Sequence, residues 1–142
     1  MGRQIRAGVL GGLAGGIVFG MLMWMMGMLP MIAGMVGSAS PAVGFLLHLL
    51  ISAMIGVGFG ILLDAYTITA GRATITGLLY GMVWWIVGPL ILMPLMMGMG
   101  LGSQWNAAAI KAALPSLMGH LIYGGILGFT YFRLAQRDRT QP

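Results

Sequence analysis

Two histidines are the residues of this chain whose side chains and positions make them the best candidates for a ligand-binding site. His48 and His120 are the only histidines, and both lie inside long apolar stretches. Neutral imidazole is the commonest metal ligand, and ionisable residues within apolar membrane segments usually mark a function. Each histidine lies one and a half turns from the expected outer end of its helix, about 8 Å deep at 1.5 Å per residue. We therefore treat both as candidate ligands at one depth.

Each histidine shares a helix face with small residues, because residues four apart lie on the same face. The two predicted stripes are Gly44, His48, Ser52, Gly56 and Ser116, His120, Gly124, Gly128. Small residues at this spacing let helices approach closely in lipid. We expect the stripes to face each other, with a groove formed by Ser52, Gly56, Gly124 and Gly128.

The histidine pattern fits several roles. In one, the stripes are a packing seam and each imidazole hydrogen-bonds a backbone carbonyl or its counterpart. In another, the groove admits a flat macrocycle, and His48 and His120 are axial ligands of a b-type haem. A third role is binding of a simple metal ion such as copper, and a fourth is passage of protons or a solute. The sequence leaves these alternatives open.

Methionine is unusually abundant, with 15 residues, most of them in the middle or outer half of the expected spans. Thioether sulfur beside imidazole suits Cu(I), which prefers soft ligands. Methionine is also an apolar filler around helix kinks, which Pro30 and Pro94 would supply. Several of the methionines are adjacent and must point in different directions. The sequence alone therefore favours the filler interpretation.

Composition excludes many other chemistries. The chain has no cysteine, which rules out disulfides, iron–sulfur clusters and thiolate zinc sites. Its two acidic residues are Asp64 and Asp138, so paired-carboxylate catalysis is not expected and we predict no enzyme. Apolar residues make up 59% and charged residues 6%, against roughly 25% charged in soluble domains. Lipid must therefore be the solvent for most of the surface.

Four segments are long enough to cross a bilayer, which takes about 20 helical residues. They are approximately Ala7–Gly34, Val43–Leu63, Ala73–Met99 and Leu114–Phe132. The predicted connections are a turn at 38–41, a polar linker at 64–71 and a longer outer connection at 100–111, in part an interfacial helix. We also expect the segments 43–63 and 114–132 to pack face to face.

Basic residues predict the orientation. The net charge is +5, but the basic residues lie at the chain ends and in one linker, so nucleic acid is not an expected partner. Lys111 alone falls on one side, and the other side holds Arg3, Arg6, Arg72, Arg133, Arg137 and Arg139. This asymmetry predicts that both termini are cytoplasmic. Segments 77–85 and 118–124 resemble those of small bacterial membrane proteins, which implies a bacterial inner membrane.

The two halves look like tandem copies. Pro30, Gly34 and Met35 recur 64 residues later, and the stripe around His48 recurs 72 residues later around His120. Each copy contains two spans, so both enter the membrane in the same direction.

The predicted fold is therefore an all-α integral membrane protein. It is one transmembrane domain, residues 1–142, a four-helix bundle of two parallel hairpin repeats. The repeats cover about 7–63 and 73–135, and a short cytoplasmic tail covers 133–142. Three functions fit it: an accessory or cofactor-holding subunit, a haem- or copper-binding redox protein, and a channel or transporter for an uncharged solute. The expected partners are the lipid bilayer and either other membrane subunits or further copies of the chain.

Overall fold

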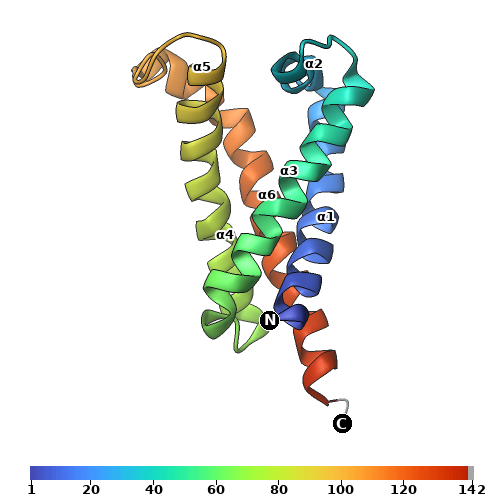
Figure 1. Ribbon diagram of the computed structural model, residues 1–142. Coiled ribbons are helices and arrows are strands. Elements are labelled where there is room, and N and C mark those ends of the chain that lie inside the picture. The colour runs from blue at the N-terminus through green and yellow to red at the C-terminus, as the bar shows by residue number, and fades with distance from the viewer. Residues whose placement is uncertain (141–142) are drawn as a thin grey trace.

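The computed structural model of the protein is all-helical (Figure 1) and describes residues 1–140, with side chains described for residues 1–135. Four segments are long and apolar enough to cross a membrane: Gly2–Met25, Pro41–Tyr66, Ala70–Met96 and Ala107–Ala135. They pack as a bundle. The prediction of a four-span helical membrane protein is therefore confirmed. Part of the predicted tail, residues 141–142 and the side chains of 136–140, lies outside the described part.

The long spans are assembled from long helices and short helical turns. The long helices are α1 (Gly2–Met25), α3 (Pro41–Leu63), α4 (Ala70–Val87) and α6 (Ala107–Thr140). The short elements are α2 (Leu29–Ala33), η1 (Gly34–Val36), η2 (Asp64–Tyr66), η3 (Gly88–Leu92) and α5 (Met93–Met96).

The first span ends earlier than the sequence predicted. Helix α1 stops at Met25, and Gly27 then adopts a φ of 67°, a left-handed conformation that glycine takes without strain. Pro30 lies in the first turn of α2, where its missing N–H costs nothing. Pro30 therefore begins a short separate helix at the outer end and does not kink a long one.

Helix α6 begins earlier than predicted. The side chain of Asn106 accepts a hydrogen bond from the Ala109 amide at 3.0 Å, which caps the helix. Residues 107–111, expected in a connection, therefore form the first turns of α6. Pro115 lies inside the helix.

The expected face-to-face packing of α3 and α6 is wrong. Helix α1 packs closely on both of these helices and α4 packs on α6, whereas the Tyr123 side chain of α6 reaches α3 with a hydrogen bond. Helix α1 carries glycines on two faces, and this explains the arrangement. Gly12 lies against Gly56 of α3, whereas Gly15 lies against Tyr123 of α6. The small residues of α6 instead meet α4, where Gly77 lies against Gly124.

The outward faces of the helices are apolar. On α3 the buried face carries small residues and His48, whereas Leu46, Leu50 and Leu62 are 67%, 58% and 70% exposed. A soluble bundle would place its large apolar side chains inside. Within each hairpin, small residues form the closest helix contacts, and many large apolar side chains face outward, as in helices that pack in lipid.

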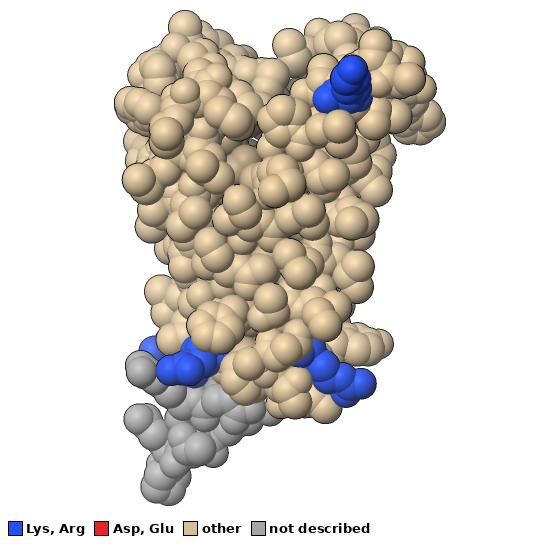
Figure 2. All heavy atoms as spheres, turned by 180° about the vertical axis from the view of Figure 1, so that it is seen from behind, with Lys and Arg blue, Asp and Glu red and all other residues tan. Residues whose placement is uncertain are grey.

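The bundle is open at one end and closed at the other. In Figure 1 the hairpin α1–α3 and the hairpin α4–α6 diverge toward the end that carries α2 and α5. They meet at the end with the N-terminus. The face in Figure 2 shows that basic side chains are also unevenly distributed: they gather at the closed end, and one lies near the open end. We call these the inner and outer ends.

Candidate ligand cavity

A cavity of about 640 Å³ lies between the two hairpins in the outer half of the bundle. One wall comes from α1, α2 and α3, and the other from α4, η3, α5 and α6. Most of its lining is apolar. Its polar side chains are those of His48, Ser52, Gln104, Ser116, His120 and Tyr123. The structure thus brings both predicted histidines to one cavity.

The imidazole of His48 is oriented by a backbone carbonyl. Its Nε2 atom lies 3.1 Å from the carbonyl oxygen of Gly16 on α1. A carbonyl oxygen can only accept, so Nε2 carries the hydrogen and donates it. In the neutral ring Nδ1 then holds a lone pair. Among the described residues, none forms a hydrogen bond with that nitrogen.

His120 is held in a similar way from within its own helix. Its Nδ1 atom donates to the carbonyl oxygen of Ser116, one turn earlier, at 2.8 Å. The hydroxyl of Ser116 lies 3.4 Å from the same nitrogen. Nε2 is therefore the lone-pair nitrogen of His120, and within the described part of the chain it has no hydrogen-bond partner. The lone pair therefore lies on Nδ1 in His48 and on Nε2 in His120.

The ring of Phe19 contacts both imidazoles. Its centroid lies 5.2 Å from that of His48 and 4.8 Å from that of His120, both in edge-on geometry. Phe19 is 4% exposed and packs over Gly119 of α6, where a methyl group would overlap its ring. A haem plane ligated by both imidazoles would have to displace this ring. The residues present do not fit a bis-histidine haem.

The small residues predicted to form a groove do not all reach the cavity. Ser52 lines it, and its backbone carbonyl accepts a hydrogen bond of 2.8 Å from the hydroxyl of Tyr123. Gly56 instead packs against α1, and Gly124 and Gly128 pack against α4. These three glycines bring helix backbones together within each hairpin and do not line the cavity.

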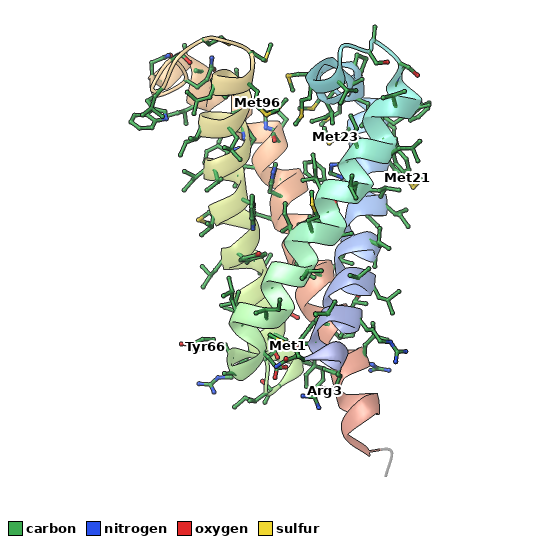
Figure 3. All side chains as sticks on the ribbon, viewed as in Figure 1. Met1, Arg3, Met21, Met23, Tyr66 and Met96 are labelled. Atoms are coloured by element: carbon green, nitrogen blue, oxygen red, sulfur yellow. The ribbon has the colours of Figure 1, made fainter. Side chains whose placement is uncertain are left out.

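Methionine is the most frequent residue type in the cavity lining. Seven line the cavity: Met23, Met26, Met28, Met31, Met35, Met93 and Met96. They come from both walls, and Figure 3 labels Met23 on one hairpin and Met96 on the other, across the gap. Adjacent methionines of one straight helix would point apart. Because helix α1 ends at Met25 and the chain turns at Gly27 into α2, methionines before and after the turn reach the same cavity.

The wall formed by α4 is irregular at the cavity. Residues Gly88–Leu92 form a π-helical turn, in which Gly88 and Pro89 line the cavity. Such turns are rare and frequently lie at functional sites. Two indole N–H groups fix this wall, because Trp85 donates to the carbonyl of Ala113 and Trp105 to that of Leu90, each at 3.1 Å.

Below the cavity the bundle is filled by aromatic side chains. Phe59 and Tyr131 are fully buried, and their ring centroids lie 5.4 Å apart. On α4, Tyr80 donates a hydrogen bond of 3.0 Å to the carbonyl of Ile55. These contacts join the hairpins in their inner half, so the cavity ends there.

No family model, no curated protein and no solved structure matches this chain. The function is therefore argued from the cavity itself.

Proposed function

We propose that this chain is a non-enzymatic membrane protein that holds a ligand in the cavity between its hairpins, with His48 and His120 as the ligating residues. The observation that carries the proposal is the state of the two imidazoles. Each donates one N–H to a backbone carbonyl and keeps a lone pair on the other nitrogen. Histidines that bind metals are typically oriented by such an outer hydrogen bond.

The position of the acidic group supports a binding role and not catalysis. Asp64 is the acidic residue among the described side chains, and it lies at the inner end beside Gln4 and Tyr131. The cavity is in the outer half, so no carboxylate of the described part accompanies the histidines there. Catalytic histidines are commonly oriented by a carboxylate, as in the Ser-His-Asp arrangement, whereas here backbone carbonyls orient both rings.

The proposal includes a tandem duplication of the hairpin. The contacts within the two hairpins support it. A methyl group on Gly12 would lie 3.1 Å from the Cα atom of Gly56, and one on Gly77 would lie 3.1 Å from the Cα atom of Gly128. Gly56 and Gly128 are the residues that the 72-residue offset relates. In this proposal His48 and His120 descend from one ancestral position.

Passage of an uncharged solute is less well supported than binding. The aromatic layer around Phe59 and Tyr131 fills the bundle below the cavity, so this conformation offers no continuous path. Association with other membrane subunits or with further copies remains part of the proposal, through the apolar outward faces.

We also propose that the inner end faces the cytoplasm of a bacterial cell, so that the cavity opens toward the outer side of the inner membrane. The support is the asymmetry of basic residues along the helices. Lys111 lies near the outer start of α6, and the inner helix ends carry Arg3, Arg6, Arg72 and Arg133.

Labelling of single cysteines tests this orientation, because the chain has no native cysteine. Ala39 lies in the exposed outer turn, and Ala65 lies in the exposed inner linker. In intact cells, A39C should react with an impermeant maleimide, and A65C should react only after the membrane is permeabilised. The reverse pattern would place the cavity on the cytoplasmic side.

Retention of a ligand tests the proposed function. The protein should be purified in mild detergent and measured by native mass spectrometry and elemental analysis. We expect wild-type protein to carry a metal or a bound mass in near-stoichiometric amount. His48→Ala and His120→Ala should lose it while keeping their helical circular dichroism.

Leu50→Ala is the matched control, because Leu50 is on the outward face of the same helix as His48. It should retain the ligand. Wild-type protein that is metal-free and of bare mass, even after supplementation of the growth medium with metal salts, would contradict the proposed function.

A further inference from the structure

We infer that the ligand of the cavity is a soft monovalent metal ion, Cu(I), bound by thioether sulfurs of cavity methionines together with the histidines. This inference rests on the proposed function, because it names the ligand class of the same cavity. It differs from the sequence-based interpretation, in which the methionines served mainly as apolar filler.

The placement of the methionines carries the inference. Met23 is 4% exposed and lies in the cavity wall contributed by α1. Met28 and Met93 are partly buried, pack against the same core and line the cavity from opposite hairpins. The cavity is thus lined by thioethers from two walls and by two imidazoles, and these are the ligand types that select Cu(I).

The methionines continue from the cavity toward the surface. A second pocket, of about 330 Å³, adjoins Pro30 and Gly34 at the outer end. It shares four methionines with the main cavity and adds Met97; the shared ones are Met31, Met35, Met93 and Met96. Met96 and Met97 are more than half exposed. Thioethers therefore extend from the exposed outer end to the cavity that contains His48 and His120.

Charge argues against harder or divalent cations. Mg²⁺ and Ca²⁺ require oxygen ligands, chiefly carboxylates, and zinc takes three or four nitrogen, sulfur or oxygen donors. No carboxylate lines the cavity, and the described residues contain no cluster of three histidine, cysteine or acidic side chains. A doubly charged ion would be uncompensated in this apolar setting. A monovalent ion with neutral ligands carries the smallest such cost.

The filler alternative makes a different prediction about substitution. Leucine has nearly the volume of methionine, so replacing one by the other usually costs little stability. If the methionines only fill space, leucine should serve equally well. If their sulfurs bind metal, leucine should abolish binding and leave the fold intact.

The experiment is an anaerobic titration of the full-length protein in detergent with Cu(I), in competition with the chromogenic chelator bicinchoninate. The test variant combines Met23→Leu, Met28→Leu and Met93→Leu. The control variant combines Met54→Leu and Met82→Leu, which alter exposed methionines that do not line the cavity. The His48→Ala and His120→Ala proteins complete the set.

We expect wild-type and control proteins to bind at least one Cu(I) with equal affinity. Loss of a group that only orients a ligand weakens metal affinity by roughly 10–100-fold, so loss of the sulfurs should weaken it by at least about tenfold. X-ray absorption of the wild-type complex should show sulfur neighbours around copper. This measurement needs no variant, so a failure of the triple variant to fold leaves the inference testable.

Two results would overturn the copper inference. One is equal Cu(I) affinity in the wild-type, control and triple-leucine proteins, and the other is a copper shell without sulfur. If the native protein nevertheless retains another ligand through His48 and His120, the proposed function stands and only the metal is wrong. If the native protein retains no ligand, both the proposed function and the copper inference fail.

Discussion

Gly124→Ala is expected to destabilise the bundle strongly, whereas Gly125→Ala, one position further along the same helix, should be tolerated. A methyl group on Gly124 would overlap the carbonyl oxygen of Gly77 in α4. One on Gly125 would lie 3.4 Å from a methyl carbon of Leu78, an ordinary van der Waals contact with a flexible side chain. The two substitutions are chemically identical and differ only in which face of α6 receives the methyl group.

The two substitutions are expected to change the free energy of unfolding in opposite directions. Alanine is favoured over glycine inside a helix by roughly 1 kcal/mol, so Gly125→Ala should be neutral or slightly stabilising. Overpacking of a tight interface costs about 1–3 kcal/mol and sometimes more, and at Gly124 the obstacle is backbone that cannot rotate away. Thermal unfolding in detergent, followed by circular dichroism, measures both variants.

Equal unfolding temperatures for the two variants would show that α4 and α6 are not in backbone contact. A second pair widens the test to the other hairpin. A methyl group on Gly56 would overlap the carbonyl oxygen of Gly8, so Gly56→Ala should be as damaging as Gly124→Ala. At Gly58 the nearest atom to an added methyl group is a side-chain hydroxyl, 2.8 Å away, and Gly58→Ala should cost less.

The sequence predicted the spans because membrane crossing depends on length and hydrophobicity, which are properties of one helix at a time. It did not predict which helices touch. Small-residue stripes occur on α3 and α6, but α1 has glycines on two faces, with Gly12 toward one neighbour and Gly15 toward the other. Spacing identifies a face that permits close approach. It does not identify the partner.

The candidate site was predictable in the same partial way. His48 and His120 stand out because ionisable residues are rare in apolar helices, and the expectation that they share a site is consistent with the cavity they line. Their use of different nitrogens could not be foreseen, because it depends on the carbonyls of Gly16 and Ser116. The sequence did not predict that methionines on both sides of Gly27 line one cavity, because this depends on the end of helix α1 before that glycine.

The second prediction of large effect concerns Asp64, which ties three parts of the chain together at the inner end. Its carboxylate accepts hydrogen bonds from the Gln4 side chain of α1 at 3.1 Å and from the Tyr131 hydroxyl of α6 at 2.7 Å. Arg3 lies 3.8 Å away. The carboxylate side chain is 17% exposed, so water replaces these partners only in part. Asp64 thereby holds the inner ends of both hairpins while their outer ends diverge.

Asp64→Ala should therefore lower the free energy of unfolding by about 3 kcal/mol, because each hydrogen bond to a charged group contributes roughly 1.5–3 kcal/mol. Tyr131→Phe removes one of these bonds and should cost less. Arg3→Ala should cost under about 1 kcal/mol, because an ion pair as long as 3.8 Å with a partly exposed arginine contributes little.

The losses of unfolding free energy caused by Asp64→Ala and Tyr131→Phe should not be additive, because both substitutions remove the same hydrogen bond. In the double variant Asp64→Ala with Tyr131→Phe, the loss should fall short of the summed single losses by about 0.5–3 kcal/mol, as for residues in one hydrogen-bond network. Denaturant unfolding of the four proteins in one detergent gives this coupling energy. Strict additivity would show that Asp64 and Tyr131 act independently, and the closed inner end would then depend on the aromatic layer of Phe59 and its neighbours.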